Sequence, residues 1–320
     1  LNSNYDRMLK DFKDGEYYKD GGRRCWTLKY SNAVGYHMDI LPAFSDENLS
    51  IIVERLFSVD KELDSTDLNK MAIRITDTEK SNYNIDTNID NWSKSNPFAY
   101  AIWFLKEARK VSGKEFFSLN ESVDPVRAYE KNKLPLQRVI QLLKRHRDIM
   151  FSNDEFERDN KPISVIITTL ATRAYDKSEN LLDAYSNIVK NMRNYIETKY
   201  NSETREYEKW VVNPINKDEN FADKWSEVFQ KEEYFYLWLD KLEEDLENIY
   251  SSNGKGLVFL NESFSNMYGK DVTKQVFENQ GNSNRLLREQ GKIRMAERTG
   301  IIGSIGIKVA NHNFEGINEK

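Results

Sequence analysis

The spacing of apolar residues along the chain changes near residue 95. Before that point, residues 24–31 and 34–41 alternate in character with a period of two, on either side of a short turn around Asn32 and Ala33. This alternation predicts a β-hairpin. Pro42 is expected to end the second strand, because proline cannot donate to a central ladder. Residues 71–77 (MAIRITD) are a further strand candidate, so we expect this part of the chain to be rich in strands.

After residue 95 the apolar residues recur at helical spacing. Ser95 and Asn96 are cap candidates, and Pro97 occupies a first-turn position of the first predicted helix. Further helices are predicted within residues 134–151, 161–175, 180–200 and 222–250. Residues 161–175 also fit a buried strand, but their length favours a helix. Strands first and helices later predict an α+β fold in two unequal parts.

The composition indicates an ordinary globular protein. Of 320 residues, 39% are hydrophobic and 31% are charged, and no apolar run is long enough to span a membrane. The single cysteine, Cys25, rules out a disulfide framework and fits a reducing cytoplasm. The net charge of −5 argues against extended, non-specific nucleic-acid binding, although a local basic patch could still bind phosphate.

A carboxylate, Asp39, interrupts the strand-like run GYHMDILPAF. In a strand, His37, Asp39 and Leu41 share one face, which an open sheet would present to a cleft. A carboxylate held there is a good ligand for Mg²⁺, an ion that supports phosphoryl transfer. The alternative is a solvated aspartate on the wet face of an amphipathic strand.

Basic residues are concentrated in the stretch LLKRHRD (142–148), which contains Lys144, Arg145, His146 and Arg147. Downstream, Ser164 lies near the start of a predicted helix, where free N–H groups and the helix dipole favour phosphate. Lys144 and Ser164 could grip the same phosphate group. The alternative is an exposed, charged helix face and an ordinary capping serine.

Taken together, these stretches resemble one family, the cGAS/DncV-like nucleotidyltransferases or CD-NTases. The resemblance covers nearly the whole chain, and its blocks keep the family's order. The blocks are residues 23–44 (RRCWTLKYSNAVGYHMDILPAF), 91–104, 134–151, 161–175 (KPISVIITTLATRAY), 211–225 and 291–316.

The resemblance implies a polymerase-β-like nucleotidyltransferase palm joined to a helical domain like that of oligoadenylate synthase. Residues 1–90 would form a partial palm. Residues 91–320 would form the mainly helical domain, with its C-terminal part packing back on the palm. Asp39 matches a catalytic, metal-binding carboxylate, and Lys144 and Ser164 match positions that contact the donor triphosphate.

The implied reaction uses ATP or other nucleoside triphosphates with Mg²⁺ or Mn²⁺. It joins them into a cyclic di- or trinucleotide second messenger of anti-phage signalling. A regulatory protein partner is compatible with the resemblance, whereas a membrane or an extended nucleic acid is not expected as a partner.

The chain departs from the family pattern in one respect. The palm of the family begins with a Gly-Ser turn followed by an Asp-x-Asp pair, and residues 1–38 contain no such sequence. Two-metal catalysis needs several carboxylates. We therefore expect an N-terminally truncated palm and an inactive chain. The alternatives are a non-catalytic relative that binds nucleotide or a partner, and an enzyme that extends RNA ends.

Overall fold

The computed structural model describes residues 20–21, 24–29, 37–45, 70–78, 80–111, 114–115, 133–153, 155–202, 204–251, 256–295, 302–303 and 306–308. The chain divides into two compact units. Unit 1 contains residues 1–132 and 212–219, and unit 2 contains residues 133–211 and 220–320. This division falls later than the predicted boundary after residue 90, because helix α4 (Pro97–Arg109) groups with the strands that precede it. The packing of the C-terminal part on the palm stays a prediction.

Unit 1 contains the predicted hairpin. Strands β1 (Asp20–Gly21), β2 (Trp26–Lys29) and β3 (His37–Ile40) form an antiparallel sheet in that order. Thr27 lies opposite Asp39 in the register. Strand β3 ends two residues before Pro42, as expected from the missing N–H of proline. The predicted turn at Asn32 and Ala33 lies outside the described residues.

A second antiparallel sheet follows, with strand order β4 (Ala43–Ser45), β5 (Ile73–Ile75), β6 (Ser93–Ser95). The strand predicted within residues 71–77 is therefore confirmed. Ile73 and Ile75 are buried on it. Just past its end, buried Asp77 accepts a hydrogen bond of 3.1 Å from the Arg24 guanidinium.

A short 3₁₀ helix (Ile89–Asn91) precedes β6, and α4 follows it. The Asn96 side chain caps α4 by accepting a hydrogen bond of 3.1 Å from the backbone N–H of Ala99, as predicted. The short strands β7 (Lys110–Val111) and β8 (Lys114–Glu115) form a two-stranded sheet after the helix.

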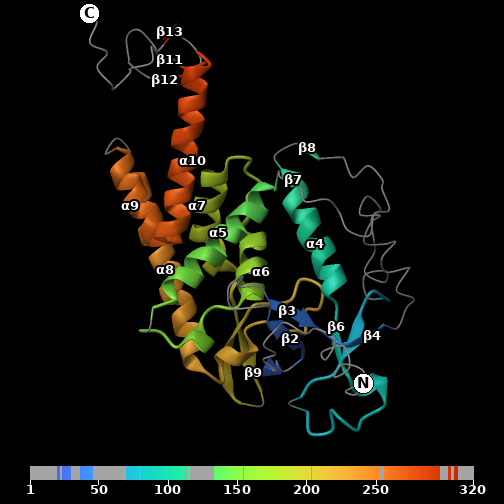
Figure 1. Cartoon of the computed structure of the whole chain (residues 1–320). Coiled ribbons are helices and arrows are strands. Elements are labelled where there is room, and N and C mark those ends of the chain that lie inside the picture. Colours follow the sequence, from blue (N-terminus) through green and yellow to red (C-terminus); the bar gives the residue numbers. More distant parts are fainter. Residues whose placement is uncertain are drawn as a thin grey trace, which may run out of the picture. The chain divides into compact units, whose positions relative to one another are not determined.

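Unit 2 is built around a helical bundle (Figure 1). Its helices are α5 (Pro135–Met150), α6 (Ser164–Ala174), α7 (Leu181–Asn191) and α8 (Phe229–Ser251). The helix predicted within residues 161–175 is therefore confirmed as α6. Short 3₁₀ turns precede α6 (Arg158–Asn160) and α8 (Asp223–Trp225). The largest fully buried side chains of the bundle include Leu136, Leu143, Phe151, Ile166, Leu170, Ile188, Phe235 and Trp238.

The prediction of one helix across residues 180–200 is wrong at its end. Helix α7 stops at Asn191, a 3₁₀ turn covers Met192–Tyr195, and β9 (Glu197–Asn201) pairs with β10 (Glu206–Trp210). The sequence of β9, ETKYN, favours a strand because threonine and tyrosine pack well on a pleated surface. Tyr200 and Tyr207 lie opposite each other, with ring centroids 5.3 Å apart.

The chain leaves unit 2 after Val211 and returns to it at Asn220. On the unit 2 side, Phe221 donates a backbone hydrogen bond of 2.9 Å to the carbonyl of Val211. In the excursion itself, Asn213 donates to the backbone and to the carboxylate of Glu219, at 2.9 and 2.7 Å. These bonds hold the two ends of the excursion together.

Helices α9 (Leu257–Tyr268) and α10 (Lys270–Glu289) form an antiparallel pair that turns at Gly269. Gly269 has φ +91°, and an added Cβ would lie 3.1 Å from Ile149 Cδ1, so the turn needs glycine. Strands β11 (Arg294–Met295), β12 (Ile302–Gly303) and β13 (Ile307–Lys308) follow.

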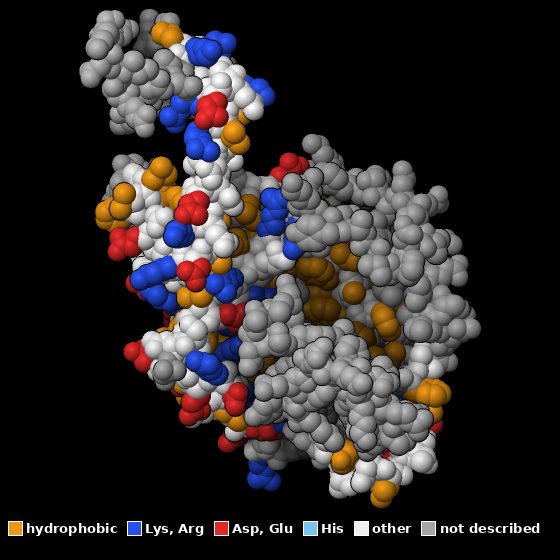
Figure 2. Space-filling model, in the orientation of Figure 1, with side chains coloured by type: hydrophobic (Ala, Val, Ile, Leu, Met, Phe, Trp, Pro, Cys, Tyr) orange, Lys and Arg blue, Asp and Glu red, His pale blue; other side chains and the backbone are white. Residues whose placement is uncertain are grey.

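Figure 2 shows Lys and Arg side chains around the C-terminal end of α10, where the exposed ones are Arg285, Arg288, Lys292 and Arg294. Among the described residues, no helix combines the length and apolar character needed to cross a bilayer.

Candidate functional site

The basic stretch predicted as a phosphate site lies on α5. The helix starts at Pro135, and the Gln137 side chain accepts a hydrogen bond of 3.0 Å from the backbone N–H of Leu134. Leu136, Val139, Ile140 and Leu143 are buried along one side, which confirms the predicted apolar stripe. This burial fixes the rotation of α5, so the positions of its charged residues follow from the packing.

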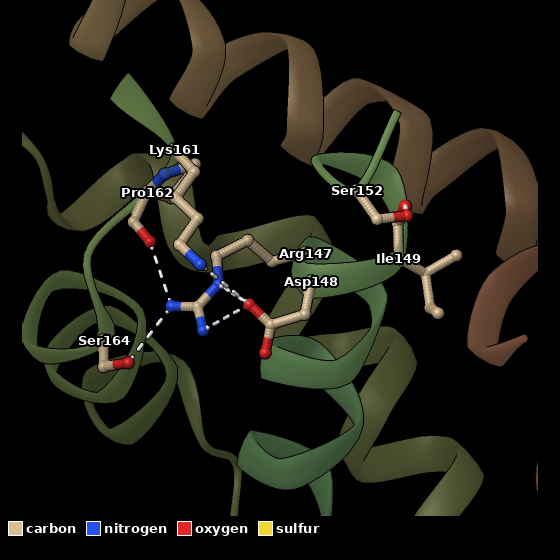
Figure 3. A network of polar contacts seen from close by, with 7 residues as sticks. All are labelled: Arg147, Asp148, Ile149, Ser152, Lys161, Pro162 and Ser164. Atoms are coloured by element: carbon tan, nitrogen blue, oxygen red, sulfur yellow. Dashed lines mark hydrogen bonds and ion pairs between the residues drawn. The ribbon is translucent and has the colours of Figure 1, made fainter. Parts of the chain in front are cut away.

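Arg147 is the centre of a polar network between α5 and the start of α6 (Figure 3). Its Nη1 donates to the carbonyl of Pro162 at 3.0 Å and to the hydroxyl of Ser164 at 3.1 Å. Its Nε and Nη2 donate to one carboxylate oxygen of Asp148, at 3.0 and 2.8 Å. Lys161 approaches the same oxygen at 3.4 Å. Arg147 is only 7% exposed. Its buried charge is compensated by Asp148, and each of its three side-chain nitrogens donates at least one hydrogen bond.

Ser164 is the first residue of α6, as the sequence predicted, but it does not cap that helix. The N-cap position is Ile163, and no side chain caps the helix. Ser164 is exposed. The N–H groups in the first turn of a helix have no intrahelical partner. They lie at the positive end of the helix dipole, which favours anions. Ser164 therefore adds a hydroxyl to a helix start of the kind that suits phosphate.

Lys144 lies one turn before Arg147 on α5 and is half-buried. Burial lowers the pKa of its ammonium below the ordinary 10.5, and the charge of Arg147 lowers it further, while Asp148 opposes both. The side chain of Lys144 makes no hydrogen bond or ion pair with any other residue that the structure describes. Lys144 lies three residues before Arg147 on α5, and Ser164 accepts a hydrogen bond from Arg147.

The other basic residues of this stretch are engaged elsewhere. Arg145 donates to the carbonyl of Tyr268 at 3.0 Å. His146 is buried and lies 3.0 Å from the carboxylate of Asp245. The expectation of several cations exposed to an anion is therefore corrected, because two of the four side chains, His146 and Arg147, are buried.

The spacing of residues along α5 is enough to predict that Arg147 and His146 are buried. Leu136, Ile140, Leu143 and Arg147 are separated by four, three and four residues, which places Arg147 on the buried stripe. The same argument applies to His146, three residues after Leu143. The contact between Asp148 and Lys161, which completes the network, cannot be predicted from spacing. It depends on the packing of α5 against the segment before α6.

Asp39 lies on β3 in unit 1, whereas Lys144 and Ser164 lie in unit 2. The side chain of Asp39 is outside the described part of the structure. Within that part, no group of three or more His, Cys, Asp or Glu side chains could hold a metal ion. The described residues therefore do not form a two-ion site, and the roles of Asp39, Lys144 and Ser164 stay predictions.

Comparison with known proteins gives one curated relative and one solved structure of interest, while no protein-family model matches the chain. A c-di-GMP synthase from Roseivirga ehrenbergii is 26% identical over 264 residues, which cover 79% of this chain. The chain spans 60% of the length of that relative.

The solved structure is a CD-NTase, CdnG from Bradyrhizobium diazoefficiens, in complex with GTP. It superposes with a TM-score of 0.56 and 19% identity, over 87% of this chain and 72% of the other. The two proteins share a fold, and this agrees with the mixed helices and strands described above. These findings confirm the resemblance to the cGAS/DncV-like nucleotidyltransferases, or CD-NTases: in sequence the chain is similar to a c-di-GMP synthase, and in fold it is similar to a CD-NTase.

Proposed function

We propose that the protein is a nucleotidyltransferase that joins nucleoside triphosphates into a cyclic di- or trinucleotide. The relative from Roseivirga is named a c-di-GMP synthase, and the CD-NTase from Bradyrhizobium was solved with GTP. GTP is therefore the first nucleotide to test, followed by ATP. The observation that carries the proposal is the hydrogen bond from Arg147 to Ser164, because it connects the helix that carries Lys144 to the predicted phosphate contact at the start of α6.

The chemistry of this cluster suits a triphosphate. Lys144 supplies a positive charge on a flexible stem, Ser164 supplies a hydroxyl, and the first turn of α6 supplies backbone N–H groups. Asp148 accepts three donors at one oxygen, so it neutralises Arg147 and leaves the charge of Lys144 available. In the proposal, these donors hold the phosphates of the donor nucleotide while another hydroxyl attacks.

Asp39 is proposed as a metal-binding carboxylate for Mg²⁺ or Mn²⁺. A bound ion of this kind activates the attacking hydroxyl and stabilises the pyrophosphate that leaves. One aspartate does not hold two ions, and residues 1–38 contain no Gly-Ser followed by Asp-x-Asp. We therefore expect this 320-residue chain to bind nucleotide without synthesising product.

The biological setting is proposed from the resemblance. The product would be a second messenger of anti-phage signalling, made in the cytoplasm and, where required, under the control of a regulatory protein partner.

Calorimetric titration of the chain with GTP and Mg²⁺ tests the binding step. The double variant K144A/S164A is expected to lose at least tenfold in affinity, since a charge and a hydrogen bond to phosphate are removed together. Lys274→Ala on α10 is the matched control, because Lys274 is exposed and lies 3.9 Å from Glu278, within its own helix. Unchanged GTP affinity in K144A/S164A would contradict the proposed site.

Synthesis is tested separately with radiolabelled GTP and ATP in the presence of Mg²⁺ or Mn²⁺. We expect no cyclic product from this chain. Product formation that disappears in Asp39→Asn would support the enzymatic assignment and refute the expected inactivity.

The second candidate function is that of a non-catalytic relative that binds nucleotide or a protein partner. The absence of the Asp-x-Asp pair from residues 1–38 favours it. Tight GTP binding by the chain, together with failure of any longer form of the protein to make a cyclic nucleotide, would support this alternative.

A further inference from the structure

We propose that Arg147 is a positioning residue that fixes the hydroxyl of Ser164 as a hydrogen-bond donor to phosphate. The inference rests on the proposed function, since it assigns a role within the same triphosphate site.

The direction of the hydrogen bond is set by chemistry. A guanidinium has five N–H donors and no acceptor. Ser164 Oγ, 3.1 Å from Arg147 Nη1, must therefore accept in this contact. A serine hydroxyl has one proton, and that proton then remains available for a different acceptor. Because Ser164 is exposed at the start of α6, an anion outside the protein can supply that acceptor.

Arg147 does not itself reach such an anion. It is 7% exposed, and its charge is paired with Asp148. Lys161 lies 3.4 Å from the same oxygen of Asp148, so this carboxylate pairs with two cations. The influence of Arg147 on phosphate therefore passes through Ser164, and a change at Arg147 should have little effect once Ser164 is removed.

The same guanidinium also fixes the backbone next to Ser164. Its Nη1 donates to the carbonyl of Pro162 at 3.0 Å, two residues before the helix start. The planar fork of arginine makes these contacts at the same time as its bonds to Asp148 (Figure 3). A lysine at this position would keep the charge but could not reproduce the fork.

A role limited to clamping α5 against α6 is the competing explanation. A clamp would affect stability and would act on phosphate binding independently of the Ser164 hydroxyl. The two explanations therefore differ in whether the effects of changing Arg147 and Ser164 add.

The experiment is a double-mutant cycle on the 320-residue chain. Arg147→Met, Ser164→Ala and the double variant are titrated with inorganic tripolyphosphate and with GTP, each in the presence of Mg²⁺, below the melting temperature of every variant. Arg147→Lys is measured alongside, because it keeps the buried charge if Arg147→Met folds poorly. Arg193→Met is the control, since Arg193 binds Asp240 and Glu243 on α8 instead.

We expect Arg147→Met and Ser164→Ala each to weaken tripolyphosphate binding about tenfold, and the double variant to be no weaker than Ser164→Ala. Arg147→Lys is expected to recover only part of the affinity. The control should bind as the wild type does.

Wild-type affinity in Arg147→Met, or losses that multiply in the double variant, would overturn the inference and leave the proposed function standing. Coupled losses for tripolyphosphate in a chain that does not bind GTP would support the inference and contradict the proposed function. A wild-type chain that binds neither compound contradicts both.

Discussion

The imidazole Nε2 of His146 lies 3.0 Å from a carboxylate oxygen of Asp245, in a buried contact between α5 and α8. Lys241 approaches the other oxygen of the same carboxylate at 3.0 Å. His146 and Arg147 are adjacent on α5. One turn of α5 is therefore attached to α8 through His146 and to the start of α6 through Arg147. The position of Lys144, one turn earlier, therefore depends on both.

Replacing Asp245 with Asn should lower the free energy of unfolding by about 1.5 kcal/mol. The substitution keeps the side-chain shape but removes the carboxylate charge that faces both Lys241 and His146, which weakens both contacts. Urea unfolding followed by circular dichroism measures the change. Asp240→Asn is a suitable comparison, because Asp240 is exposed and its 2.7 Å pair with Arg193 is expected to contribute less than about 1 kcal/mol. Equal losses of stability in the two variants would contradict the larger contribution expected from the buried Asp245.

Asp245 also predicts how stability changes in acid. Burial raises the pKa of its carboxyl, but the hydrogen bonds from His146 and Lys241 outweigh this effect, and the pKa lies below the ordinary 3.8. A pKa lowered by folding contributes stability above the unfolded value, and that stability is lost as the pH falls through the folded value. The stability difference between wild type and Asp245→Asn should therefore shrink as the pH falls below 3.8. A difference that grew on acidification would reverse the sign and refute the argument.

Lys144 predicts an alkaline limit to nucleotide binding. Burial and the neighbouring charge of Arg147 lower its pKa below 10.5, so the ammonium loses its proton at a lower pH than an exposed lysine does. If Lys144 holds a phosphate, GTP affinity should fall as the pH rises toward this pKa. Lys144→Arg should bind with a flatter profile, because a guanidinium stays charged. Parallel profiles for the two proteins, measured by calorimetry across the alkaline range, would exclude Lys144 as a phosphate ligand.

Trp238 on α8 is fully buried, and its indole N–H has no hydrogen-bond partner among the described residues. Trp238→Ala should destabilise unit 2 by about 4 kcal/mol through the cavity it leaves. Trp238→Phe should cost much less, since the ring is largely retained and an unsatisfied donor is removed. Chemical unfolding compares the two variants, and a larger loss in Trp238→Phe than in Trp238→Ala would contradict the packing described here.

Much of the fold can be predicted from local features of the sequence. The caps at Asn96 and Pro97, the position of Pro42 and the apolar stripe of α5 each depend on residues close together in the chain. Their predicted elements are found where expected. The apolar spacing of α7 does not predict the hairpin β9–β10, because it continues in the sequence as far as Tyr195, which is exposed in the structure.

The candidate site was harder to predict because its contacts are distant in sequence. Local features and the family resemblance predict Ser164 and Lys144, but the same reasoning makes Arg147 an exposed cation, whereas the structure buries it beside Ser164. Its burial depends on how α5 packs against α6, and this packing decides whether a charge faces water or a carboxylate. Asp39 lies in the other unit, and its contribution remains a prediction.

The excursion of residues 212–219 into unit 1 has a practical consequence for dissecting the protein. The polypeptide passes between the units at three places, after residues 132, 211 and 219. Proteolysis between Asn132 and Lys133 would separate residues 1–132 from the rest of the chain and leave the excursion attached to unit 2. A recombinant fragment starting at Lys133 would carry the normally buried Val212 and Asn213 without the rest of unit 1. Such a fragment should be prone to aggregation unless these residues are replaced by a short polar linker.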